Sequence, residues 1–287
     1  MYKIEICSCS KKNHHFVQES ISKKFKKTNK PLYILDLQSI LIKEKNPSKT
    51  FQEFYLYPKE TLSEIKKDKI IKTKLDGINQ IFKDLDKCIE CNIGKYVETP
   101  FSKITDEIIK KYNNNNNLKI NISENEKCII KNYFFFQFGR TPQMKDFMIQ
   151  AAKKWRKTSN KSIQNFKENE YFWIYGIISN FFDKSQYRLF NLKNIKILIN
   201  FTNLPFILGS QGLFMTGNVR PKIEILQIYL PIHPNIIILL ENDNDGIEIV
   251  KDETFIHELN LLNLKNSEST SFISGDKEYL EKLKKEI

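Results

Sequence analysis

Two adjacent histidines, His14 and His15, are the residues of this chain best suited to proton transfer, and a run of lysines follows them. Imidazole changes its charge near neutral pH, so it can act as an acid or a base. Apolar residues recur three or four positions apart over 13–25, which predicts an amphipathic helix with Asn13 as its N-cap. His14 then lies on the apolar face. His15 lies off it, where the helix dipole would keep the ring neutral, as a base or as a hydrogen-bonding group that fixes the helix start.

Arg140 and Ser210 lie at two breaks further along the chain. Arg140 is part of the Gly-Arg-Thr-Pro break between two predicted helices, and Ser210 is part of a Gly-Ser-Gln turn after an apolar run. The guanidinium could hold an anion at the start of the next helix, or it could cap the last carbonyls of the preceding one. If His15, Arg140 and Ser210 converge, they predict a phosphodiester or nucleotide site. His15 would be the base there, with Arg140 and Lys23 stabilising negative charge.

The net charge of +12 is concentrated in two segments. Residues 1–31 hold eight lysines and two glutamates, and residues 151–167 hold six basic residues, no acidic residue and Trp155. Basic residues interleaved with an aromatic ring suit phosphate contacts and base stacking, so RNA or DNA is a possible partner. The residues expected to contact nucleic acid are Lys23, Lys24, Lys153, Lys154, Arg156 and Lys157. Because only four residues of the chain are arginines, a plain solvated lysine-rich surface is the alternative.

Five cysteines, an odd number, favour reduced thiols over a disulfide framework. Cys7 and Cys9, together with Cys88 and Cys91, have spacings from which zinc could be held with a nearby histidine. Ordinary reduced thiols are the alternative, and no other cofactor is expected. The acidic stretch 242–246 lacks the last ligand of a calcium loop, so it predicts a hairpin turn.

Several functional classes have no support in the sequence. No phosphate-cradling Walker sequence, no dinucleotide-binding Gly-x-Gly-x-x-Gly and no Gly-x-Ser-x-Gly nucleophile elbow occurs. No apolar run is long enough to cross a bilayer, and the N-terminus lacks the apolar core of a signal peptide. These observations predict a cytoplasmic protein without a membrane partner. They do not predict an oligomeric state.

The order of the patterns predicts a single α+β domain over 1–287, in which a central helical bundle packs against a mixed or antiparallel sheet. N-terminal strands and a helix over 1–60 and a strand-rich region over 191–287 would build the sheet, on either side of a helical region over 61–190. The expected strands are 32–37, 51–57, 195–199, 206–208, 223–230, 236–240 and 271–274. Helices are expected over 123–139, with Ser123 and Glu126 as a capping box, over 254–264 and from 277 onward.

Four segments of the chain resemble the motifs of an uncharacterised bacterial protein family. The segments are His14–Phe25, Phe138–Pro142, Phe206–Leu213, and Leu230–Pro234 with the apolar strand after it. They are similar, in order and spacing, to that family's His-His-Tyr-Val-Pro-Gln-Phe-Tyr-Leu-Arg-Asn-Phe, Arg-Thr-Pro, Phe-Ile-Thr-Ser-Asp-Asn-Pro-Val and Pro-Leu-Ser-Pro patterns. Ser210 stands where the family has aspartate, and Gly212 where it has proline. If that aspartate is a metal ligand or a base, this chain has lost it. The resemblance implies no activity.

These observations lead to one interpretation and two alternatives. The first is a protein that binds nucleic acid or a nucleotide, such as a nuclease of the defence or toxin type whose active site is partly lost. The second is a noncatalytic binding or interaction module with a lysine-rich surface. The third is a zinc-stabilised structural subunit of a larger assembly.

Overall fold

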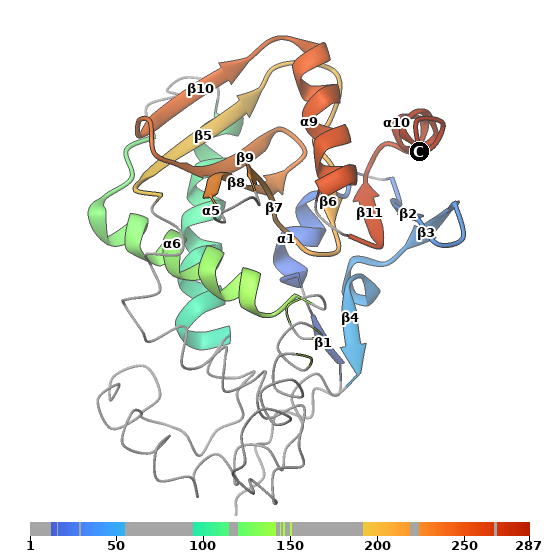
Figure 1. Ribbon diagram of the computed structural model, residues 1–287, viewed down its shortest axis with the longest axis horizontal. Helices are drawn as coiled ribbons and strands as arrows, with labels where there is room; N and C mark the ends of the chain where they lie inside the picture. The colour runs from blue at the N-terminus through green and yellow to red at the C-terminus, as the bar shows by residue number, and fades with distance from the viewer. Residues whose placement is uncertain are drawn as a thin grey trace, which may run out of the picture.

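The described chain contains a five-stranded sheet and a four-stranded sheet, both covered by helices (Figure 1). The computed structural model describes residues 13–15, 17–28, 30–54, 94–114, 120–141, 192–218, 224–266 and 269–287, together with Met144, Asp146 and Gln150. Both helices and strands occur along this part of the chain, so the predicted α+β class is confirmed.

The five-stranded sheet consists of β5 (Asn194–Asn200), β7 (Phe214–Asn218), β8 (Glu224–His233), β9 (Ile236–Glu241) and β10 (Gly246–Val250). Its strand order is β10-β5-β9-β8-β7, and every pairing is antiparallel except that of β10 with β5. The central strand β9 is buried along its whole length, which is why it is a continuous apolar run in the sequence.

The hairpin predicted at 242–246 is wrong, because β10 pairs with β5 and not with β9. Polar groups of this segment instead form hydrogen bonds with the first residues of β5. Asp245 accepts a hydrogen bond at 2.7 Å from the Ile195 backbone N–H, and the Asn194 amide donates to the carbonyls of Asn242 and Asp243 at 3.0 Å. The Asn- and Asp-rich composition therefore supports a crossover and not a two-residue turn.

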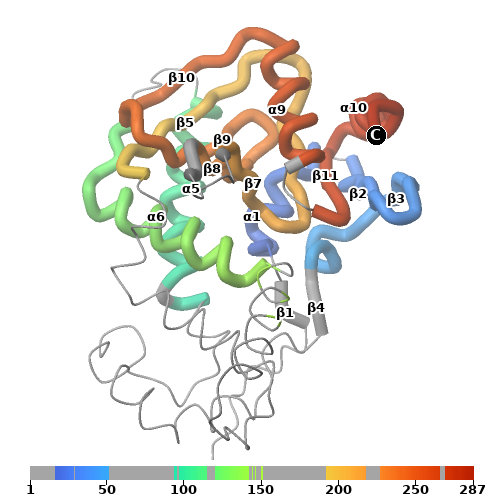
Figure 2. The backbone as a smooth tube through the Cα atoms, viewed as in Figure 1, coloured from blue at the N-terminus to red at the C-terminus, as the bar shows by residue number. Residues whose placement is uncertain are grey.

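The four-stranded sheet joins the two ends of the chain, as Figure 2 shows by the blue and red segments that lie side by side. Its strands are β2 (Leu32–Asp36), β3 (Leu41–Lys45), β6 (Leu208–Gly209) and β11 (Ser271–Ser274). The order is β3-β2-β11-β6, antiparallel throughout. A sheet built from N-terminal and C-terminal strands was predicted, and this sheet confirms it.

The described α-helices are α1 (Glu19–Lys24), α5 (Thr99–Asn113), α6 (Glu124–Gly139), α9 (Glu253–Asn266) and α10 (Lys277–Lys284). A single-turn helix η1 (Pro47–Lys49) precedes β4 (Gln52–Phe54), and the π-helical segment η2 (Gly94–Glu98) leads into α5. The capping box of Ser123 and Glu126 is present at the start of α6 and confirms that prediction. No helix in the described ranges is both long and apolar enough to cross a bilayer.

The helix predicted over 13–25 is wrong in its first half. Asn13–His15 form the strand β1, which pairs antiparallel with β4, and α1 begins only at Glu19. Pairing with a strand about 40 positions away thus overrides the local helical period. The helices predicted between 61 and 93, and those after 150, lie outside the described residues.

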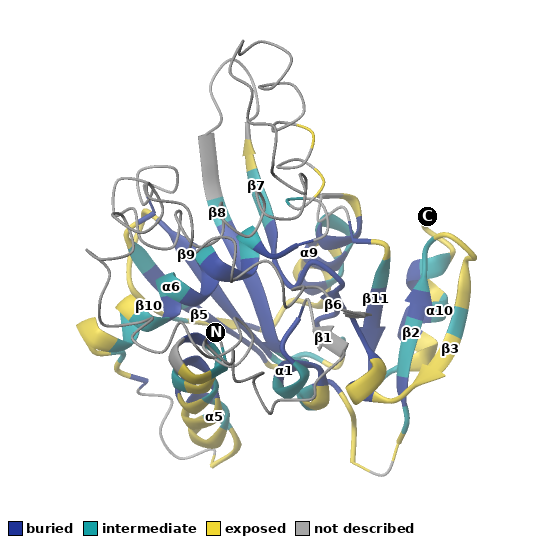
Figure 3. Ribbon diagram, turned by 90° about the horizontal axis from the view of Figure 1, so that it is seen from below, coloured by how far each residue is buried: buried dark blue, intermediate teal, exposed yellow. Residues whose placement is uncertain are grey.

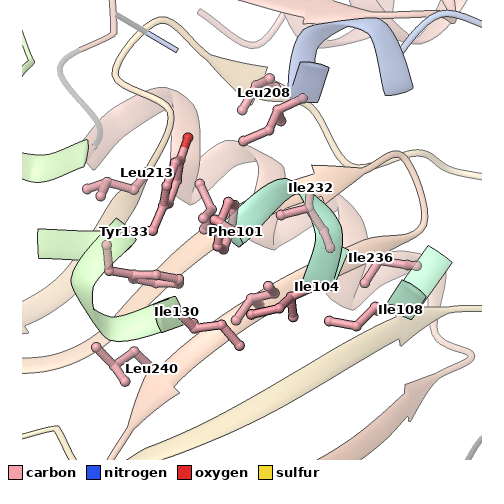
Figure 4. Packing of buried hydrophobic residues seen from close by; sticks show 14 of the residues in the cluster. Phe101, Ile104, Ile108, Ile130, Tyr133, Leu208, Leu213, Ile232, Ile236 and Leu240 are labelled. Carbon is pink, nitrogen blue, oxygen red and sulfur yellow. The ribbon is translucent and has the colours of Figure 1, made fainter. Parts of the chain in front are cut away.

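The main core fills the space between the five-stranded sheet and the pair α5 and α6 (Figure 4). The rings of Phe101 on α5 and Tyr133 on α6 stack with their centroids 3.7 Å apart. The opposite face of the sheet packs against α9, and Figure 3 shows the buried strands between these two layers. A third apolar cluster joins the four-stranded sheet to α10. The layers are therefore helices, sheet and helix, with the smaller sheet beside them.

His233 is a largely buried histidine at an irregular point of β8, where the register with β9 shifts. Its Nδ1 accepts a hydrogen bond at 3.2 Å from the backbone N–H of Asn235. Burial, and secondarily the positive charge of Lys24, lowers the pKa of His233 from 6.5 to about 4. The ring is therefore neutral at physiological pH.

Acidification should destabilise the protein through His233. Because its folded-state pKa lies below the ordinary value, the unfolded chain binds the proton more tightly, and the free energy of unfolding falls as the pH falls from 6.5 to about 4. This loss should reach about 3 kcal/mol. In His233→Asn the amide oxygen can still accept the Asn235 hydrogen bond, but the side chain cannot take up a proton. Urea denaturation across this pH range should give a shallower curve for the variant, and parallel curves would contradict the assignment.

Candidate functional site

Arg140 is buried at the end of α6, with none of its side chain exposed. Its Nη1 donates to Oε1 of Glu98 at 2.6 Å, and its guanidinium carbon lies 5.1 Å from the centroid of the Phe136 ring. Its backbone N–H continues the helix by bonding the Phe136 carbonyl. Because the guanidinium binds a carboxylate inside the protein, this geometry gives Arg140 a positioning role in the fold.

Polar side chains from three segments surround this ion pair. The amide of Gln18 donates to the backbone carbonyl of Glu98 at 3.3 Å, and the Tyr133 hydroxyl donates to the Gln137 side-chain oxygen at 3.4 Å. Burial raises the pKa of the Tyr133 phenol well above its usual range, so the hydroxyl stays protonated. We call Gln18, Glu98, Tyr133, Gln137 and Arg140 the Arg140 cluster. It lies where α1, η2 and α6 meet.

The turn around Ser210 is fastened to the same region. Ser210 is 8% exposed, and its hydroxyl accepts a hydrogen bond from the Thr270 backbone N–H at 3.1 Å. The Gln211 backbone N–H donates to the Ser269 hydroxyl at 3.1 Å. On the other side of the turn, Gln137 of the Arg140 cluster donates to the Gln211 carbonyl at 3.0 Å. The turn therefore joins β11 to α6.

Gly212 closes the turn with a positive φ of 78° and faces α6 and the segment before α1. A Cβ at this position would lie 2.8 Å from Nε2 of Gln137 and 3.1 Å from Cγ2 of Val17. Only glycine combines this backbone conformation with so close an approach. The segment after His15, the end of α6 and the Ser210 turn thus meet.

The convergence does not by itself assign chemistry. The backbone of His15 lies in β1 and its side chain is outside the described part, so the helix-dipole argument for a neutral base no longer applies. Arg140 and Ser210 both have partners within the fold. Catalysis by His15, Arg140 and Ser210 therefore stays a prediction from the sequence.

The two predicted nucleic-acid contacts within the described residues, Lys23 and Lys24, differ in their surroundings. The Lys23 side chain is 62% exposed and pairs with Glu19 at 2.9 Å. Lys24 instead donates to the Thr105 hydroxyl at 2.8 Å and pairs with Asp106 at 2.7 Å, and burial lowers its pKa. Lys24 thus anchors α1 to α5. The other predicted contacts, Lys153, Lys154, Arg156 and Lys157, lie outside the described residues.

The described ranges contain no group of three or more His, Cys, Asp or Glu side chains that could hold a metal ion. Cys128 is an exposed free thiol on α6. The four cysteines of the predicted zinc site lie outside these ranges, so zinc stays a prediction.

Sequence reasoning missed the partners of Arg140. Glu98 precedes Arg140 by 42 positions, and the residues around Glu98 do not indicate that it forms a buried ion pair. Gln137 could have been found, because it is the one amide side chain in the apolar run 133–138, where a buried polar group needs a partner.

The chain belongs to the family described as "Protein of unknown function (DUF4238)", whose model matches residues 13–278. The predicted resemblance to an uncharacterised family is thereby confirmed, and the match spans all four segments on which it was based. No curated protein matches the chain, and no solved structure does.

Removing one partner of the Arg140–Glu98 pair should destabilise the fold strongly, because a buried charge is left without its counterion. We expect Arg140→Met and Glu98→Leu each to lower the free energy of unfolding by about 3–5 kcal/mol, and the double variant to lose less than their sum. Lys23→Gln, which breaks an exposed pair, should cost less than about 0.5 kcal/mol. Chemical denaturation measures all four. Additive losses in the double variant would show that the pair is not coupled.

Gly212→Ala should also destabilise the fold, by more than about 1 kcal/mol, because the methyl group meets Gln137 and the backbone strains at this φ. Gly94→Ala is the matched control, since no atom lies within 4 Å of its added Cβ. It should be neutral or stabilising by up to about 1 kcal/mol. Equal melting temperatures for the two variants would show that the turn adapts to a side chain.

Proposed function

We propose that the chain binds nucleic acid through exposed lysines, and that the Arg140 cluster positions the binding segments without taking part in catalysis. The observation that carries the proposal is the stretch that begins on α1, in which Lys23, Lys26, Lys27 and Lys30 are exposed. This stretch belongs to the first of the two basic segments, each with a net charge of +6.

The fold around this stretch supports the proposal. Lys24 ties α1 to α5, and Lys27 pairs with Asp276 at the start of α10 at 2.8 Å. Lys26 and Lys30 form no ion pair with a carboxylate of the described residues, although the charge of Lys30 contributes to the lowered pKa of Asp276. Lys24 and Lys27 thus fix a short basic segment in place, and the ammonium groups of its other lysines stay available to phosphates. Because the segment is already ordered, binding costs little conformational entropy.

Lysine contacts of this kind bind phosphate as point charges and carry no base-sequence information. We therefore expect similar affinity for strands of equal length and different sequence. Noncatalytic binding is the interpretation that we favour, because Arg140 and Ser210 already have partners inside the protein. Cleavage of a labelled oligonucleotide that is lost in His15→Ala would favour the nuclease interpretation instead.

Binding should be sensitive to salt, and the exposed lysines should set that sensitivity. We expect the variant Lys23→Gln, Lys26→Gln and Lys30→Gln to weaken binding of a labelled oligonucleotide and to reduce the slope of log K against log salt by about 1 per lysine that contacts phosphate. The variant Lys153→Gln, Lys154→Gln and Lys157→Gln tests the second basic segment in the same way. Fluorescence anisotropy over a salt titration measures both.

The matched control removes three exposed lysines elsewhere, with the same change in net charge. Lys265→Gln, Lys282→Gln and Lys285→Gln lie on α9 and at the end of α10. If this control reduces the slope as much as the first variant does, binding depends on overall charge and not on the segment after α1. If the wild-type chain binds no oligonucleotide at low salt, the proposed function is wrong.

A further inference from the structure

Phe201 is an aromatic side chain that the fold holds in an exposed position. It follows the last residue of β5 and is 47% exposed, although most large apolar residues of this sheet are buried. A single exposed apolar residue is ordinary on a protein surface. The rigidity of its backbone and the identity of its neighbours distinguish this one.

The backbone at Phe201 is fixed on both sides. The Phe201 N–H donates to the Val250 carbonyl at 2.9 Å. The preceding Asn200 is fully buried, and its amide group donates to the Leu204 carbonyl at 2.6 Å and accepts from the Thr202 N–H at 2.8 Å. These hydrogen bonds fix the backbone that carries the ring, so the position from which the ring extends is preorganised.

The ring of Tyr112 lies beside Phe201, and the ring of His233 lies beside Tyr112. The ring centroid of Tyr112, at the end of α5, lies 6.0 Å from that of Phe201 at an interplanar angle of 69°, and 6.0 Å from that of His233. Asn235 donates to the Tyr112 hydroxyl at 2.6 Å and holds this ring in place. We call Phe201, Tyr112 and His233 the aromatic platform. Because His233 is kept neutral, the platform carries no charge of its own at physiological pH.

The charges around the aromatic platform suit a phosphate backbone. Lys110 and Lys111 are exposed in the last turn of α5, directly before Tyr112. The positive charge of Lys24, which anchors α1 to α5, contributes to the lowered pKa of His233. Acidic groups lie here as well: the Glu253 carboxylate accepts from the Asn203 backbone N–H at 3.2 Å, and the charge of Lys111 contributes to the lowered pKa of Glu126.

We propose that the aromatic platform is a stacking site for one unpaired base of a single-stranded nucleic acid, with Phe201 as the ring that the base covers. This inference rests on the proposed function and refines it, because it names the form of nucleic acid. Lysines alone do not distinguish a single strand from a duplex. An exposed ring beside lysines does, since an unpaired base can offer a free π-face, whereas the faces of a base inside a duplex are covered by its stacked neighbours.

The test compares Phe201→Ala with wild type on a short single-stranded oligonucleotide and on an abasic strand with the same backbone. Phe201→Ala should bind the base-bearing strand about 5- to 100-fold more weakly, which is the loss expected for one stacked base, and should bind the abasic strand as wild type does. Phe255→Ala removes another exposed ring, 38% exposed on α9, and should change neither affinity. Phe201→Trp should keep the affinity, and its added fluorescence should be quenched only by the base-bearing strand.

The failures of the two proposals are distinguishable. If wild type and Phe201→Ala bind the base-bearing strand equally, the stacking site is wrong and the proposed function stands. If Phe201→Ala loses affinity for both strands alike, the effect is not stacking, and the inference is again wrong. If wild type binds neither strand nor a duplex, the proposed function fails and the stacking site fails with it. Quenching of Phe201→Trp by the base-bearing strand alone supports the inference even if the alanine variant is poorly folded.

Discussion

The arrangement of the described chain depends on one buried charge and its partner. Moving a guanidinium out of water costs several kcal/mol, and a close carboxylate with further hydrogen bonds is needed to offset that cost. Glu98 meets this requirement for Arg140 only if η2 lies against the end of α6. A pair of apolar side chains in the same place could be equally stable, but it would not fix the position of η2 relative to the end of α6. The ion pair permits one arrangement, and Gln18 and Gln137 extend that arrangement to α1 and to the Ser210 turn.

Whether a strand could be predicted from the sequence depends on its place in the sheet. The inner strands β5, β8, β9, β2 and β11 are apolar runs and were predicted, β11 with its observed bounds. Three of the missed strands, β3, β7 and β10, lie at the edges of the two larger sheets. Edge strands expose polar and charged residues, which also limits pairing with other chains, so their apolar period is weak. The strand β1, where a helix was predicted, was missed for a different reason, since only its distant partner β4 makes it a strand.

The same distinction between local and distant partners applies to the candidate site. The capping box of α6 and the break after Gly139 involve neighbours in the sequence, and both were predicted. The sequence offered the meeting of His15, Arg140 and Ser210 only as a condition for a site, and it indicated none of the partners that hold Arg140 and Ser210 in place. The bond from Arg140 to Glu98 spans 42 positions and that from Gln137 to Gln211 spans 74, so no local pattern encodes them. An arginine at a helix end looks the same in sequence whether it binds a ligand or a buried glutamate.

The two kinds of cation are divided between the interior and the surface, and this division bears on function. Arg140, the one arginine within the described ranges, is inside, where its weakly hydrated planar group tolerates burial better than an ammonium would. The exposed basic groups of α1 and of the last turn of α5 are lysines, which attract phosphate without reading base edges. A surface of this kind discriminates poorly among polyanions. Under the proposed function, selectivity must then come from an uncharged feature, and the proposed stacking on Phe201 would favour strands whose bases are free to stack.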